Sequence, residues 1–292
     1  GVVLAGLLSA LRITGGKLAD QRFLFLGAGE AGLGCGKQIV AAMVSEGVSE
    51  KEARDRCWFF DIGGLVVRGR KGLSDEHKLY SHDHPHIDDF LEAVKSIKPT
   101  AIIGASAQAG AFTKDVLEAM GSLNERPIVF ALSNPTAKAE CTPEDAYRHT
   151  GGRAVYASGS PFKPVEIDGR TFVPGQANNA YVFPGIGLGV VAVEATRVSD
   201  EMFYASAKAL AGMVSDKDLV FRYPIAASLQ MSALLGDGAG IYAAEEDGDA
   251  EGMVVGEKRQ GDRPGTEGED GRGEGPQASG EGEEEPAVPP DG

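Results

Sequence analysis

The sequence predicts an α/β fold, a Rossmann-like doubly wound architecture with a mainly parallel sheet. Residues 23–32 read FLFLGAGEAG, an apolar run followed by the pattern Gly27-x-Gly29-x-x-Gly32 and a helix-like stretch to about Met43. Further short apolar runs alternate with helical stretches along the chain. This alternation is typical of parallel strands joined by helices that cover both faces of a sheet.

The amino-terminal elements are expected in the following order. An apolar helix over residues 2–13 precedes a strand over 22–26, the helix after the glycines and a short polar helix, SEKEARDR. The next strand is CWFFDI, residues 57–62, and GLVVRG extends it or folds back as a hairpin. Residues 71–86 are polar, which predicts a loop, and a helix follows over 87–96.

Continuous apolar runs predict three more strands, over residues 100–104, 127–133 and 154–158, with a helix over 113–120 between the first two. The dipeptide Asp168-Gly169 inside VEIDGRTFV is a hairpin signal. Helices fit residues 187–197 and 200–214.

Charge and composition divide the chain. Residues 245–292 hold 16 acidic and 4 basic residues, a charge of −12 out of −15, which leaves −3 for residues 1–244. We expect a folded domain over 1–240 and a disordered acidic Gly/Glu/Pro-rich tail over 245–292, because the tail has too little apolar surface to offset its chain entropy. The absence of a basic excess argues against nucleic acid as a partner, and no apolar run reaches membrane-spanning length. Three cysteines without paired spacing indicate an intracellular protein.

The glycine pattern predicts a phosphate-binding turn. Gly27 permits a tight turn, Gly29 lets the main chain approach a pyrophosphate, and Gly32 lets the helix pack near the strand. The free N–H groups and the positive dipole end of the helix then face the phosphates. The residues predicted to bind the cofactor here are Gly27, Ala28, Gly29, Glu30, Ala31 and Gly32. Asp61 ends the second strand, where it either accepts hydrogen bonds from the adenosine ribose or is simply solvated.

Further candidates follow later strands and precede a helix. Gly104, Ala105, Ser106 and Asn134 lie at strand ends that meet at the ligand-binding edge of the sheet, although Asn134 also suits a turn before a proline. Asn178 and Asn179 offer amide groups, with helix capping as the alternative. A metal site at His82, His84 and His86 is disfavoured because their loop lacks a rigid element, and packing is favoured over a reactive thiolate for Cys35.

Several segments together resemble malic enzymes, the oxidative decarboxylases of malate. These segments are FLFLGAGEAGLG, ERPIVFALSNPTAKAECTPEDAY, RAVYASGSPF and FVPGQANNAYVFPGIGLG, within a resemblance over about residues 2–219. The last looks closest to plant and algal members. The resemblance implies the Rossmann-like cofactor domain of a larger, homo-oligomeric enzyme that converts L-malate and NAD(P)+ to pyruvate, CO2 and NAD(P)H with Mg or Mn. It assigns the glycine turn to the pyrophosphate, Asp61 to the ribose, and Asn134, Asn178 and Asn179 to malate and the nicotinamide ribose.

The resemblance also implies what this chain does not contain. The family's catalytic tyrosine and lysine, and its metal-binding carboxylates, lie in a preceding domain, so we expect no catalytic or metal-ligating residue here. The alternative function is a noncatalytic dinucleotide-binding or regulatory module. NAD and NADP both stay open, because Ile62-Gly63 replaces the Ser-Lys usual in NADP-using members while Arg68, Arg70 or Lys78 offers a cation for the 2′-phosphate. Cytoplasm, plastid and mitochondrion are not distinguished.

Overall fold

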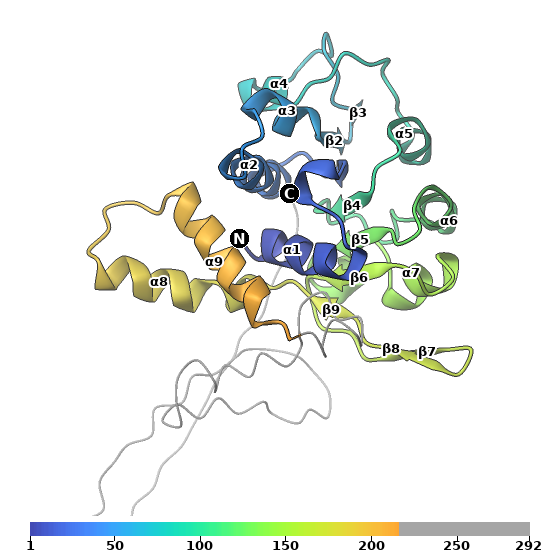
Figure 1. The fold of residues 1–292 in the computed structure, drawn as a ribbon. Coiled ribbons are helices and arrows are strands. Elements are labelled where there is room, and N and C mark those ends of the chain that lie inside the picture. The colour runs from blue at the N-terminus through green and yellow to red at the C-terminus, as the bar shows by residue number, and fades with distance from the viewer. Residues whose placement is uncertain (216–292) are drawn as a thin grey trace, which may run out of the picture. The chain divides into compact units, whose positions relative to one another are not determined.

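The computed structural model describes residues 1–215, which are built around a seven-stranded sheet of order β3-β2-β1-β4-β5-β6-β9 (Figure 1). The strands are β1 (Phe23–Leu26), β2 (Cys57–Asp61), β3 (Gly64–Leu65), β4 (Ala101–Gly104), β5 (Ile128–Ala131), β6 (Val155–Ser158) and β9 (Gly175–Gln176). All neighbouring strands are parallel except β3, which is antiparallel to β2. The chain returns to the middle of the sheet between β2 and β4, so the order reverses at β1. The predicted doubly wound α/β fold is confirmed.

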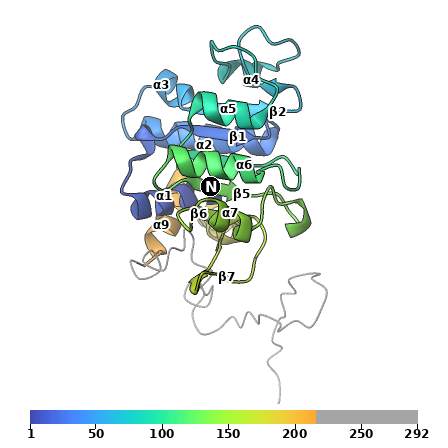
Figure 2. The ribbon, with the colours of Figure 1, turned by 90° about the vertical axis from the view of Figure 1, so that its right-hand side faces the viewer.

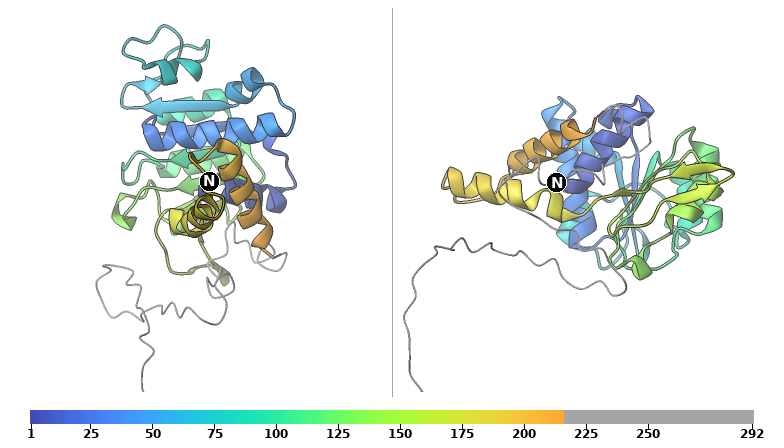
Figure 3. Two further views of the ribbon diagram at one scale, coloured as in Figure 1. Left: turned by 90° about the vertical axis from the view of Figure 1, so that its left-hand side faces the viewer. Right: turned by 90° about the horizontal axis from the view of Figure 1, so that it is seen from below.

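Helices cover both faces of this sheet. One face carries α1 (Val2–Thr14), α2 (Glu30–Ser45) and α9 (Asp200–Met213), and the other carries α5 (Phe90–Ile97), α6 (Lys114–Leu123) and α7 (Pro143–His149) (Figures 2 and 3). Every residue of β1, β4, β5 and β6 is buried. Alternate residues of β1 therefore enter separate apolar cores, with Phe23 and Phe25 in one and Leu24 and Leu26 in the other.

Smaller elements surround the sheet. Helices α3 (Glu50–Asp55) and α4 (Asp75–Leu79) flank β2, and α8 (Phe183–Ala192) precedes α9. The predicted hairpin forms from β7 (Val165–Ile167) and β8 (Arg170–Phe172). Asp168 and Gly169 at its turn have φ angles of 51° and 72°, which a two-residue turn of this kind requires. Single turns of 3-10 helix lie at Leu18–Asp20, Thr136–Lys138 and Asn179–Tyr181.

The predicted element boundaries need several corrections. Residues 71–86 were expected to be a loop but contain α4, whose start is capped reciprocally by Ser74 and His77. Helix α7 and strand β9 were not predicted, although Thr142 followed by a proline is a helix-start signal. Helix α5 starts at Phe90 rather than 87, because Asp89 caps it, and β5 ends at Ala131 rather than 133. Helix α8 was placed at 187–197 but spans Phe183–Ala192.

Two expectations concern the carboxyl-terminal part of the chain. The proposed acidic tail over 245–292 lies outside the described residues, and so do the last residues of the domain drawn over 1–240. In the described part, every helix is too short or too polar to span a lipid bilayer.

Candidate functional site

The glycine turn connects β1 to α2 and leaves no room for side chains at its first and third glycines. Gly27 has a φ of 114°, in the left-handed region that favours glycine, and a Cβ there would lie 2.5 Å from the carbonyl oxygen of Ala105. A Cβ on Gly32 would lie 2.1 Å from the carbonyl oxygen of Gly27. The turn is thus packed against the loop after β4 on one side and against its own helix on the other.

The second glycine faces open space instead. Gly29 is the N-cap of α2, no side chain caps this helix end, and a Cβ on Gly29 would meet no heavy atom within 4 Å. Glu30 and Ala31 are exposed. The first N–H groups of α2 therefore point out of the helix with the positive end of its dipole behind them. This arrangement fits the pyrophosphate of a dinucleotide.

Asp61, the last residue of β2, lies one strand away from the glycine turn. Its Oδ1 accepts a hydrogen bond from the Gly63 N–H at 2.7 Å, and its Oδ2 accepts one from Arg70 at 2.5 Å. Arg70 also donates to the carbonyl oxygen of Gly64 at 2.7 Å. Two donors orient this carboxylate, and each oxygen retains a lone pair for another donor, such as a ribose hydroxyl.

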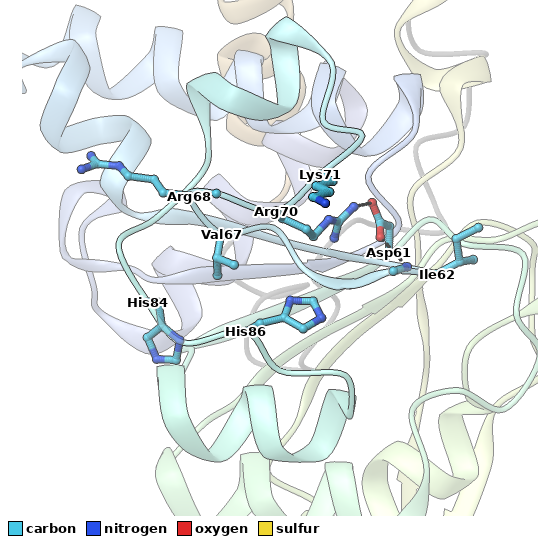
Figure 4. Close-up of a pocket in the computed structure, with 10 residues that line it drawn as sticks. Asp61, Ile62, Val67, Arg68, Arg70, Lys71, His84 and His86 are labelled. Carbon is cyan, nitrogen blue, oxygen red and sulfur yellow. Dashed lines mark hydrogen bonds and ion pairs between the residues drawn. The ribbon is translucent and has the colours of Figure 1, made fainter.

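A cavity of about 620 Å³ opens beside the Asp61–Arg70 pair (Figure 4). Arg70 points toward Asp61, whereas the Arg68 side chain points away from this pair. Cationic and histidine side chains outnumber the single carboxylate, so the cavity suits an anionic group. Lys78 is not among the lining residues and pairs with Asp75 at 2.7 Å. The lining residues are Asp61, Ile62, Gly63, Val67, Arg68, Gly69, Arg70, Lys71, His84 and His86.

The predicted amides gather around the loop after β6. Asn134 Oδ1 accepts a hydrogen bond from Ser160 Oγ at 2.6 Å, and Asn178 Nδ2 donates to the carbonyl oxygen of Gly159 at 3.3 Å. Asn178 Oδ1 also accepts from the Ala180 N–H at 2.9 Å, so the capping alternative describes its local role correctly. Asn134 and Asn179 are exposed. The peptide bond between Asn134 and Pro135 is cis.

The histidine segment and Cys35 do not add a reactive site. The ring of His82 stacks on Trp58 with 3.5 Å between centroids, and burial lowers the pKa of His82. His86 contacts Asp88 at 2.7 Å. No set of three or more His, Cys, Asp and Glu side chains within residues 1–215 is placed to hold a metal ion. Burial raises the pKa of Cys35, in agreement with a packing role rather than a thiolate.

Three side chains at this edge of the sheet escaped the sequence reasoning. Lys71 lines the cavity, and His77 Nε2 lies 2.8 Å from the carbonyl oxygen of Ala28 in the glycine turn. Glu140 is fully buried beneath Gly104 and Ser106. The spacing Ser74-x-x-His77 is a helix-cap pattern that was available in the sequence. A lone glutamate in a polar segment gives no comparable signal.

These features define a dinucleotide-binding protein of the Rossmann type, with a glycine turn at the point where strand order reverses and an acid one strand away. The family model described as "Malic enzyme, NAD binding domain" matches residues 1–233. The chain therefore belongs to the malic enzyme family.

Individual relatives agree with this assignment. The chain is 52% identical to the human mitochondrial NADP-dependent malic enzyme over 219 residues, and 51% identical to the chloroplastic NADP-dependent malic enzyme of Flaveria trinervia over 227 residues. Each alignment covers 75% of this chain but only 36% and 35% of the respective relative. These near-equal values settle neither the organelle nor a plant or algal origin. The crystal structure of Entamoeba histolytica malic enzyme has a TM-score of 0.58 and 27% identity, covering 74% of this chain and 40% of that one.

Proposed function

We propose that this chain supplies the cofactor-binding half of an NAD(P)-dependent malic enzyme, which converts L-malate to pyruvate and CO2. The observation that carries the proposal is the glycine turn at the point of strand reversal, with an uncapped helix end and open space at Gly29. NAD(P)+ would accept the hydride from malate. The turn residues Gly27 to Gly32 would hold its pyrophosphate, and Asp61 would hold the adenosine ribose.

The remaining predicted residues would form the nicotinamide and substrate side. Gly104, Ala105 and Ser106 follow β4 and border the glycine turn, which makes them neighbours of the bound cofactor. Asn134, Asn178 and Asn179 would orient malate and the nicotinamide ribose. Neutral amides offer donors and acceptors together, so they can orient a carboxylate without taking a proton from it.

The proposal assigns the proton-transfer groups and the metal to other parts of a longer protein. The chain spans about a third of the length of the relatives compared above. Since residues 1–215 offer no cluster for Mg or Mn, no step of the proposal runs through a metal held by them. Helix α8 supports a larger assembly, because it is apolar all round yet exposes Phe183 and Leu188 by 58% and 71%. A homo-oligomeric enzyme and the lack of nucleic-acid or membrane partners stay predictions.

Between the two cofactors, we favour NADP. Arg70, Lys71 and the neighbouring histidines line the cavity beside Asp61, so the 2′-phosphate of NADP would enter a basic environment next to the residue proposed to hold the ribose. The relatives named above are NADP-dependent. Ile62, which is 98% exposed, offers no polar group to that phosphate.

A pair of assays on the purified chain tests the function. We expect NADPH to bind, and we expect no NADPH to form from L-malate, NADP+ and Mn2+. Failure to bind either dinucleotide would remove the proposal, and turnover of malate would show that the chain is not merely the cofactor half. The alternative, a noncatalytic module, is distinguished by the coding sequence upstream. A preceding domain with a tyrosine, a lysine and paired carboxylates supports the enzyme.

A further inference from the structure

Glu140 lies between β5 and α7 and exposes 0% of its surface. Its Oε1 accepts hydrogen bonds from Ser133 Oγ at 2.5 Å and from the N–H and Oγ of Ser106 at 3.0 and 3.1 Å. Its Oε2 accepts from the Ser133 N–H at 3.3 Å. All four partners are donors, which is the arrangement that a carboxylate satisfies best. One buried side chain thus joins the loop after β4 to the loop after β5.

The surroundings of Glu140 are shaped to hold it. A Cβ on Gly104 would lie 2.4 Å from the Glu140 Cδ, so only glycine leaves space for the carboxylate there. Ala107 has a φ of 55°, which alanine rarely adopts, and its N–H donates to Ser133 Oγ at 2.8 Å. The same hydroxyl that supports this backbone conformation donates to Glu140. Strain held in place by a surrounding network is characteristic of functional loops.

These two loops border one particular part of the predicted cofactor site. Asp61 and the basic cavity lie at the end of β2, and the glycine turn follows β1. A dinucleotide that extends across the strand ends from the β2 side therefore brings its nicotinamide half over β4 and β5. The carbonyl oxygen of Ala105, next to Ser106, already contacts the glycine turn, since a Cβ on Gly27 would lie 2.5 Å from it.

We propose that Glu140 is a positioning residue, which fixes the loops after β4 and β5 in the arrangement that accepts the nicotinamide half of the cofactor. This inference rests on the proposed function. Glu140 itself does not contact the cofactor. It acts through Ser106 and Ser133, and its loss allows the two loops to separate while the adenosine side stays unchanged.

The test compares two ligands of the full chain, NADP+ and 2′,5′-ADP, which lacks the nicotinamide half. For Glu140→Ala we expect NADP+ to bind about tenfold more weakly, because buried donors lose their acceptor, while 2′,5′-ADP binds within about twofold of the wild type. Glu140→Gln keeps the shape and one acceptor oxygen, so it restores part of the loss. Glu144→Gln, on the exposed first turn of α7, is the matched control and binds both ligands normally.

Each result has a defined meaning. Weaker binding of NADP+ alone supports the positioning role. Unchanged binding of both ligands overturns it, and so does an equal loss for both, which indicates a general structural role. If Glu140→Ala does not fold, Glu140→Gln decides by the same criteria. A wild-type chain that binds neither ligand contradicts the proposed function instead.

Discussion

Replacing Gly32 by alanine tests the glycine turn at the place where it tolerates least. The new Cβ would lie 2.1 Å from the carbonyl oxygen of Gly27, whereas ordinary contact begins at 3.4 Å. The turn and the helix must therefore separate by roughly 1.3 Å, the difference between these two distances. Neither atom can move alone, because both belong to rigid backbone at the junction of β1 and α2.

The expected loss of binding follows from this displacement. A shift of about 1 Å breaks one or two hydrogen bonds from N–H groups to a charged phosphate, each contributing about 1.5–3 kcal/mol. Since about 1.4 kcal/mol corresponds to a factor of ten, NADPH should bind roughly 10- to 100-fold more weakly. Overpacking should also lower the free energy of unfolding by about 1–3 kcal/mol.

Gly34→Ala is the matched control for this measurement. Gly34 belongs to the same helix, is exposed, and a Cβ there would meet no heavy atom within 4 Å. This variant should bind NADPH normally and gain about 0.5–1 kcal/mol of stability, as alanine does in helix interiors. The assay is a fluorescence titration with NADPH, accompanied by urea denaturation to establish that each variant is folded. Equal affinities for the two variants would refute the role assigned to the turn.

Two more predictions concern the cavity and the histidine segment. Arg70→Gln should lower the ratio of NADP to NAD affinity by about tenfold, because a charged partner of the 2′-phosphate is lost, whereas Arg68→Gln, whose side chain points away from Asp61, should leave the ratio within about twofold; equal ratios would show that Arg70 does not select the cofactor. Burial lowers the pKa of His82 from 6.5, so protonation opposes folding and this part of the stability is complete above pH 6.5 and lost as the pH falls below it. In urea denaturation followed by Trp58 fluorescence, the stability difference between the wild type and His82→Phe should therefore shift against the wild type below that pH, and a difference independent of pH would contradict the argument.

The sequence sufficed for the fold class because its signals are local and mutually consistent. Each central strand is a continuous apolar run, and each is buried on both faces. The glycine pattern required a turn of one geometry, which Gly27 and Gly32 show through contacts that a Cβ would violate. Helix α4 was missed because its residues are polar and its cap depends on His77, an uncommon partner in a capping box.

The site was predictable only in part, since several of its contacts join distant segments. Asp61 was correctly placed at a strand end, but its pairing with Arg70 depends on the β2–β3 hairpin, which the sequence left as one of two alternatives. Glu140 was missed because burial of a carboxylate depends on donors from two other loops, and nothing in its neighbouring residues indicates them. Asn178 shows the reverse case, since the local capping role could be read directly from the sequence.

The central claim, that the strand ends around the glycine turn form an NAD(P) site, is tested most directly by titrating the purified 292-residue chain with NADPH and following the nicotinamide fluorescence. The structure predicts saturable binding that both NADP+ and 2′,5′-ADP displace. A chain that is folded but shows no saturable binding, or binding that these ligands do not displace, would contradict the account.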